Sequence, residues 1–107
     1  GADAANGAVL TCPCAPSPAD FTTKYKEING QDPGTYSAEG YDAMSVFLKG
    51  LDDGNDSREK MLDFVQNVDM KGITKQIKFD ETGEVADVVI YAYKVENGEI
   101  QPGTPIE

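Results

Sequence analysis

The longest periodic pattern of hydrophobic positions in the chain covers residues 36–51. Apolar or small residues recur there every three or four positions, at Tyr36, Gly40, Ala43, Met44, Phe47 and Leu51. This spacing predicts an α-helix with one buried stripe. The triplet Asp32-Pro33-Gly34 before it forms a turn and cannot continue a helix. Tyr36 is therefore expected on the first helical turn, where its ring either packs into the core or leans toward a ligand.

A shorter helix is predicted before this one, over residues 17–29. Ser17 suits the N-cap, and Pro18 suits the first helical position, where no amide donor is needed. Gly30 can adopt the left-handed conformation that ends a helix. The apolar stripe of this helix would be Phe21, Tyr25 and Ile28.

A third helix is predicted over residues 57–68. Asp56 or Ser57 can cap it, and Asp56 with Glu59 three residues later fits a capping box. Its apolar face would consist of Met61, Leu62, Phe64, Val65 and Val68.

Strands are predicted on both sides of the helices. Residues 8–12 are an apolar run that ends at Pro13, which is typical of a buried strand. From residue 73 to residue 79 the pattern alternates with a period of two, interrupted on its apolar face only by Lys75. That face would carry Ile73, Ile77 and Phe79.

The end of the chain predicts a turn, an interior strand and a hairpin. Residues 80–84 have turn composition, and residues 88–93 are apolar on both faces, as in an interior strand. Asn97-Gly98 is a strong hairpin signal into a short strand at 99–101. Regular structure is expected to end at the residues that disfavour strands, Pro102, Gly103 and Pro105.

The predicted order is β-α-α-α-β-β-β, an α/β fold with about three helices packed on a small mixed sheet. Three amphipathic helices and an interior strand require a larger sheet than about four short strands provide. The chain is therefore expected to dimerise or to be a piece of a larger fold.

Charge and composition narrow the function. The 107 residues suit one small domain and carry a formal net charge of −10, which disfavours binding to nucleic acid or anionic lipid. Histidine is absent, so histidine-based triads and histidine metal sites are excluded. No run approaches the roughly 18 apolar residues of a membrane span. The chain begins with Gly1 rather than Met, so we expect residues upstream of it.

Cys12 and Cys14 flank Pro13. A bridge between them would close a very small ring, so we expect two free thiols or a bridge to a cysteine outside this chain. Two thiolates supply only half of a tetrahedral zinc site, and no metal or other cofactor is expected.

Paired carboxylates such as Glu81 and Glu84 are the only obvious candidates for catalytic residues. They lie in a predicted turn without a nucleophile or metal partner, so we expect solvated turn residues and no catalytic site.

Several ordered motifs resemble a known family. Residues 7–11, 32–43, 71–74 and 77–84, followed by a tyrosine-rich strand and Asn97-Gly98, resemble the C-terminal part of leucine-binding-protein-like substrate-binding proteins. These are the extracytoplasmic, type I periplasmic binding proteins of branched-chain amino acid ABC importers.

The resemblance implies two α/β lobes, joined by three hinge crossings, that close over a small ligand. The chain, 1–107, would be a single unit from the C-terminal part of such a protein, whose first two-thirds is absent. Residues 7–14 would be a hinge-crossing strand, residues 17–70 three helices that cover one lobe, and residues 72–102 the returning strands and hairpin.

The function implied by the resemblance is solute capture rather than catalysis. The full-length parent would bind a branched-chain amino acid or similar ligand and deliver it to a membrane ABC permease. It would be extracytoplasmic, as a periplasmic protein or a cell-surface lipoprotein. Tyr36 is the one ligand contact that carries over; Ser37 and Glu39 beside it are expected on a solvated face. The fragment by itself is not expected to bind ligand.

The alternative is a stand-alone acidic interaction module that buries its helix stripes by dimerising. A homodimer or a domain swap of the fragment is compatible with both interpretations, because unpaired sheet edges favour exchange.

Overall fold

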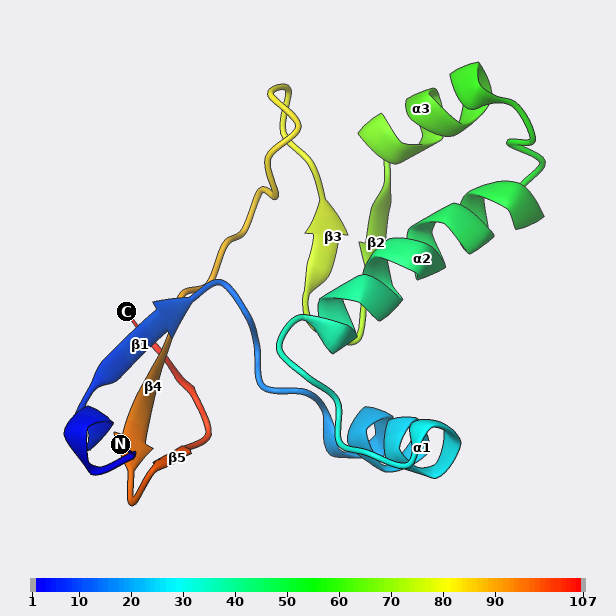
Figure 1. The fold of residues 1–107 in the computed structure, drawn as a ribbon. Coiled ribbons are helices and arrows are strands. Elements are labelled where there is room, and N and C mark those ends of the chain that lie inside the picture. The colour runs from blue at the N-terminus through cyan, green and yellow to red at the C-terminus, as the bar shows by residue number, and fades with distance from the viewer. Residues whose placement is uncertain (1, 107) are drawn as a thin grey trace. The chain divides into compact units, whose positions relative to one another are not determined.

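The computed structural model describes residues 2–106 and confirms an α/β fold with three α-helices (Figure 1). The described residues divide into two compact units. Unit 1 comprises residues 2–16 and 88–106, and unit 2 comprises residues 17–87. The elements are η1 (Ala2–Ala5), β1 (Val9–Cys12), α1 (Ala19–Asn29), α2 (Ser37–Asp52), α3 (Arg58–Gln66), β2 (Asp69–Lys71), β3 (Gln76–Lys78), β4 (Tyr91–Glu96), β5 (Glu99–Ile100) and β6 (Thr104–Pro105).

Unit 1 is a small antiparallel sheet built around β4. Strand β1 pairs with one edge of β4, and β5 and β6 pair with β4 as well. The predicted hairpin is confirmed, since Asn97 (φ 52°) and Gly98 (φ 80°) both take the positive φ of a tight turn between β4 and β5. The expected end of order at Pro102 was wrong, because β6 returns to pair with β4.

The limits and burial of these strands differ from the sequence prediction. β4 begins at Tyr91 rather than residue 88, because its partner β1 ends at Cys12, opposite Tyr91, where Pro13 follows. Residues 88–90 therefore stay outside the strand. The expectation that β1 is buried was also wrong: Val9 is 56% exposed, because no element of unit 1 covers its apolar side chain.

Cys12 and Cys14 form a disulfide, so the expectation of free thiols or an external bridge was wrong. The chain turns at Pro13 and brings the two Cα atoms to 5.2 Å, inside the usual range for a disulfide. The hydroxyl of Tyr93 on β4 donates a hydrogen bond of 2.6 Å to the carbonyl of Cys14.

Unit 2 begins with α1, which lies where the sequence predicted a helix. None of its residues is buried, although a buried stripe was expected. Gly30 ends it in the left-handed conformation, and its N–H donates to Lys26 O at 2.8 Å. Pro18, not Ser17, is the N-cap residue, and no side chain caps the helix. Ile28 was expected in the core but is 82% exposed.

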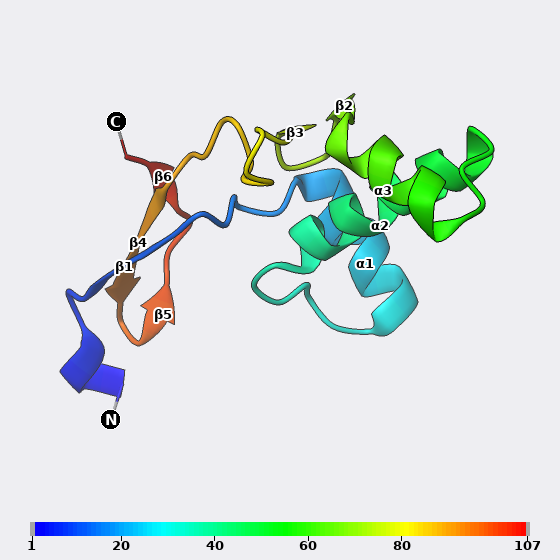
Figure 2. The same ribbon diagram turned by 90° about the horizontal axis from the view of Figure 1, so that it is seen from above.

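The buried stripe of α2 is not the predicted one. The buried positions are Ala38, Asp42, Val46 and Gly50, spaced every four residues. Of the predicted stripe, Tyr36, Met44, Phe47 and Leu51 are about half exposed. The face that carries Gly50 is buried because α3 packs closely against it. Only a residue without a side chain allows this approach, since a Cβ added to Gly50 would lie 2.7 Å from Met61 Sδ. Figure 2 shows α2 and α3 side by side.

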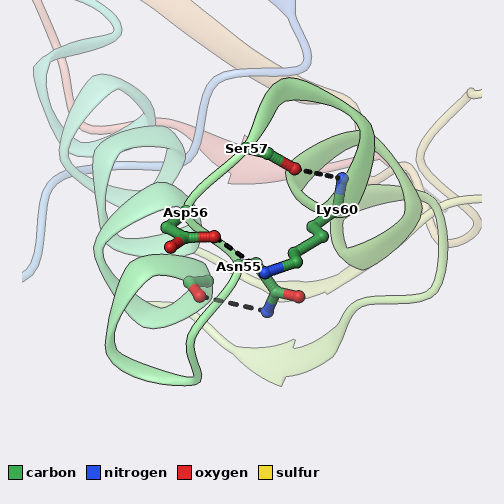
Figure 3. Close-up of polar contacts among 5 residues, drawn as sticks. Asn55, Asp56, Ser57 and Lys60 are labelled. Carbon is green, nitrogen blue, oxygen red and sulfur yellow. Dashed lines mark hydrogen bonds and ion pairs between the residues drawn. The ribbon is translucent and has the colours of Figure 1, made fainter.

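Side-chain contacts fix the turn between α2 and α3 (Figure 3). Ser57 is the N-cap of α3, and its Oγ accepts a 3.3 Å hydrogen bond from Lys60 N. Asp56 instead pairs with Lys60 Nζ at 2.8 Å, so the capping box of Asp56 with Glu59 does not form. Asn55 Nδ2 donates to Gly50 O at 3.0 Å and closes the end of α2.

A two-stranded antiparallel sheet of β2 and β3 completes unit 2. β2 was missed because only two residues separate it from α3, and the predicted strand over 73–79 shortens to β3. Asp80 to Glu84 forms the expected turn, bounded by a bridge between Phe79 and Val85. The core of this unit is Val46, Val68 and Ile77, with Phe64, Val65, Met70 and Phe79 packed around them.

Candidate functional site

Tyr36 lies at the entry to α2 rather than inside its first turn. It is the N-cap residue, in the left-handed conformation with φ 65° and ψ 7°, and it is 51% exposed. An aromatic residue at positive φ is a backbone outlier. In this chain Tyr36 therefore lies at the surface of unit 2 and not in its core.

The start of α2 has no side-chain cap. Ser37 N donates to Gly34 O at 3.1 Å, and Gly40 N donates to the Tyr36 carbonyl at 2.9 Å. Ser37 and Glu39 are half-buried rather than on the fully solvated face that we expected. The peptide groups at this end carry the positive end of the helix dipole.

An apolar groove in unit 2 lies beside α2 and has a volume of about 400 Å³. Its walls come from α2, α3, β3 and the segments that flank β3. Tyr36 is not among its lining residues, which are Glu39, Asp42, Ala43, Val46, Phe47, Val65, Thr74, Lys75, Ile77, Phe79 and Val85. The structure therefore does not bring the predicted ligand contact into this groove.

Asp42 is the buried charged residue of unit 2, with 4% of its surface exposed. Its carboxylate accepts hydrogen bonds from Ile73 N at 2.7 Å, Thr74 N at 2.9 Å and Thr74 Oγ1 at 2.5 Å. These bonds tie α2 to the turn between β2 and β3. We call this set of three hydrogen bonds the Asp42 clamp. Both carboxylate oxygens of Asp42 accept hydrogen bonds in the clamp, so Asp42 positions the groove wall and is not available to bind a ligand.

Sequence reasoning missed Asp42 because the predicted stripe placed it on the solvent side. The available signal was Gly72, two residues before Thr74. A Cβ at Gly72 would lie 2.4 Å from Asp42 Oδ2, so only glycine permits this approach.

The charged groups outside the groove form exposed local pairs. Asp69 on β2 accepts hydrogen bonds from Lys78 Nζ (3.0 Å) and Gln76 Nε2 (2.6 Å), and these partners lower the pKa of Asp69. The hydrogen bond to Asp69 raises the pKa of Lys78. Hydrogen bonds from the side chain and backbone of Thr82, and from the backbone of Glu84, lower the pKa of Asp80.

The next residues to consider are the acidic side chains that could act in catalysis or bind a metal. Glu81 and Glu84 are exposed in the turn after β3. Within residues 2–106, no group of three acidic, cysteine or histidine side chains gathers as metal ligands. None of the helices in this part of the chain combines the length and the apolar character needed to cross a membrane.

Comparison with known proteins gives structural relatives. No protein-family model matches the sequence, and no curated protein matches it. A leucine-binding protein from Thermotoga maritima matches 98% of this chain with a TM-score of 0.75 and 27% sequence identity. A substrate-binding protein of an ABC transporter from Desulfitobacterium hafniense, in complex with leucine, matches 91% with a TM-score of 0.70 and 21% identity. A branched-chain amino acid transporter substrate-binding protein from Streptococcus pneumoniae, in complex with isoleucine, matches 92% with a TM-score of 0.74 and 17% identity.

The chain spans about a third of the length of these relatives: 32%, 31% and 30% of the three chains in the same order. It therefore has the fold of the corresponding segment of the leucine and branched-chain amino acid-binding proteins, which is the type I periplasmic binding protein fold. These relatives are substrate-binding proteins and not enzymes.

Proposed function

We propose that the chain is the C-terminal part of an extracytoplasmic solute-binding protein, which captures a branched-chain amino acid or a similar small ligand for an ABC importer. The observation that carries this proposal is the match of 98% of the chain, at 27% identity, to a leucine-binding protein. In this function the parent protein delivers the ligand to a membrane permease.

The apolar surface of the chain supports the proposal. Met44, Phe47, Leu48 and Leu51 lie on α2 and are about half exposed. A short apolar face of this kind requires a covering layer. The chain spans about a third of its relatives, so the remainder of a larger protein would supply that layer.

Tyr36 is the proposed ligand contact. A left-handed backbone at an aromatic residue costs roughly 1–2 kcal/mol, and strained residues of this kind concentrate at binding sites. The strain orients an exposed aromatic ring at a helix N-terminus, next to peptide N–H groups that favour a carboxylate. An amino acid ligand offers both an apolar side chain and a carboxylate to such a surface.

The chain alone is not expected to hold the ligand. Tyr36 is half of a site, because a cleft that closes over an amino acid needs a second wall. The groove beside α2 is lined mainly by apolar residues, and its buried acid, Asp42, is already bonded to Ile73 and Thr74.

Isothermal titration tests the proposal. The protein encoded by the complete reading frame is titrated with leucine, isoleucine and valine, and then with other amino acids, amides and small acids. We expect heat from at least one branched-chain amino acid and none from residues 1–107 alone. Absence of heat with every ligand would refute the proposal for the parent protein.

A variant series tests Tyr36 separately. We expect Tyr36→Ala to weaken binding by the parent about tenfold, which corresponds to about 1.4 kcal/mol. Tyr41→Ala is the matched control, since Tyr41 lies in the first turns of α2, close to Tyr36 in the sequence, and is similarly exposed. Unchanged affinity for Tyr36→Ala would remove Tyr36 from the site and leave the function of the parent untouched.

The exposed apolar face of α2 also favours the second candidate, an acidic module that dimerises. Sedimentation analysis of residues 1–107 distinguishes the two. A dimer that buries the α2 face, together with no ligand binding by the parent, would favour the module. A folded monomer would exclude it.

A further inference from the structure

We propose that the Cys12–Cys14 disulfide is a thiol-exchange site, which an external low-molecular-weight thiol opens by attacking Cys12 Sγ, and that opening it loosens residues 13–16, which lead into the first of the two chain connections between the units. This inference does not depend on the proposed function.

The disulfide lies where the chain leaves unit 1. β1 ends at Cys12, unit 1 ends at Pro16, and unit 2 begins with the next residue. The same bond therefore closes the last turn of unit 1 and controls the first residues of the connection. Pro13, Pro16 and Pro18 stiffen this segment, so a local turn within it alters the direction in which the chain continues.

The bond holds a turn that an open chain need not keep. The Cα atoms of Cys12 and Cys14 are 5.2 Å apart. Two residues of extended chain span up to roughly 7 Å, so a reduced segment is free to lengthen. A bridge across one intervening residue restricts few residues of the unfolded chain, so its main structural effect is local.

The two cysteine residues differ in exposure. Cys14 is 5% exposed, and Cys12 is half-buried at the end of an edge strand. Exchange requires an incoming thiolate to reach one sulfur atom along the disulfide axis, so access decides which one is attacked. The geometry favours attack at Cys12 Sγ with Cys14 as the leaving thiolate.

Other parts of unit 1 hold the Cys14 side of the turn. The Tyr93 hydroxyl donates to the Cys14 carbonyl at 2.6 Å. Gly103 lies against the Tyr93 ring, since a Cβ at Gly103 would be 2.4 Å from Tyr93 Cζ. Tyr93 thus holds the Cys14 backbone against β4 while the disulfide is intact.

The chemistry balances as follows. An external thiolate forms a mixed disulfide with Cys12 and displaces Cys14 as a thiolate, which takes up a proton. When the reagent is a dithiol, its second thiolate attacks the mixed disulfide and releases Cys12. The protein gains two electrons and two protons, and the dithiol is oxidised to its own disulfide.

Mass spectrometry and 15N relaxation on residues 1–107 provide the test. Before reduction we expect no thiol that reacts with maleimide, and after dithiothreitol two. The backbone order parameters of Cys14 and Ala15 should fall after reduction, while those of Lys94 and Val95 in β4 remain unchanged. Two reactive thiols before reduction, or unchanged order parameters at Cys14 and Ala15, would overturn the proposal.

Trapping of the mixed disulfide tests the direction of attack. Brief treatment of the unmodified chain with reduced glutathione, followed by acid quenching and peptide mapping, identifies the cysteine that carries glutathione. We expect at least ten times more glutathione on Cys12 than on Cys14. Equal labelling, or more glutathione on Cys14, would contradict attack at Cys12.

Tyr93→Phe tests the coupling to β4. Removing the hydroxyl should make reduction by dithiothreitol about three- to tenfold faster, because the Cys14 carbonyl loses its donor. Tyr41→Phe in unit 2 is the control and should leave the rate unchanged. Equal rates for the two variants would exclude a role for Tyr93 in retaining Cys14.

Discussion

Asp42 on α2 holds Thr74 of the β2–β3 turn with a single carboxylate oxygen, Oδ2, which lies 2.9 Å from Thr74 N and 2.5 Å from Thr74 Oγ1. The residues are 32 positions apart in sequence, and Asp42 is buried. The clamp therefore joins helix and hairpin at the wall of the apolar groove, where neither hydrophobic pattern nor helix propensity would have indicated a contact.

Removal of this carboxylate should destabilise unit 2. We expect Asp42→Ala to lower the free energy of unfolding by about 2–4 kcal/mol, because it leaves the Ile73 and Thr74 amides without their charged acceptor. Urea denaturation followed by circular dichroism measures the change. Asp52→Asn, on the exposed end of the same helix, should change stability by less than about 0.5 kcal/mol.

A double-mutant cycle separates the Asp42–Thr74 pair from the rest of the clamp. Thr74→Val should cost about 1–2 kcal/mol in the unmodified chain and close to nothing when Asp42 is already alanine. Additive effects in the two backgrounds would show that Thr74 stabilises the hairpin independently of Asp42.

Alanine substitutions at Gly72 and Gly40 should change the stability of the chain in opposite directions. Gly72→Ala should destabilise the chain by about 1–3 kcal/mol, because its Cβ would overlap the Asp42 carboxylate. Gly40→Ala, inside α2 with open space around the position, should instead stabilise by about 0.5–1 kcal/mol through helix propensity. Thermal unfolding of both variants gives the sign, and two equal shifts would contradict the close approach at Gly72.

Tyr36→Gly tests the backbone strain at the head of α2. Glycine removes a left-handed penalty of roughly 1–2 kcal/mol and adds about 0.5–1 kcal/mol of unfolded-state entropy, so stability should be unchanged or rise by up to about 1.5 kcal/mol. Met44→Gly, at an exposed position inside α2, should lower stability by about 1 kcal/mol. Loss of stability in Tyr36→Gly similar to that in Met44→Gly would mean that the ring stabilises the fold.

The Asp69–Lys78 pair sets a pH dependence with a defined sign. The lowered pKa of Asp69 means that the pair stabilises β2–β3 above the ordinary aspartate value of 3.8, and this is lost as pH falls through the lower folded value. The raised pKa of Lys78 adds stability below 10.5, which is lost as pH rises through the higher folded value. Asp69→Asn should flatten both limbs of the stability profile. If stability depended on pH with the same slope in the unmodified chain and in Asp69→Asn, the Asp69–Lys78 pair would be excluded as the cause of the pH dependence.

Several features of the chain followed from the sequence alone. The three helices, the glycine that ends α1, the Asp80 to Glu84 turn and the Asn97-Gly98 hairpin were predicted from residues close together in the chain. Such signals depend on local sterics and backbone hydrogen bonds, which need no distant partner. The ordered motifs also indicated the type I binding-protein fold.

The site was predictable only in part. The sequence singled out Tyr36 but could not show that it lies outside the helix at positive φ, because local pattern does not fix the residue at which a helix begins. Asp42 was unpredictable from periodicity, since a buried acid depends on donors from a turn 31 and 32 residues away.

The sequence by itself determined where the chain turns, which segments form helices and which fold they resemble, because those properties rest on neighbours in the chain. Tertiary structure alone decided which face of α2 is buried, where β4 begins and that Cys12 pairs with Cys14. Burial and register depend on which side chains arrive from elsewhere, and a small residue such as Gly50 admits a close neighbour where a larger apolar residue would not.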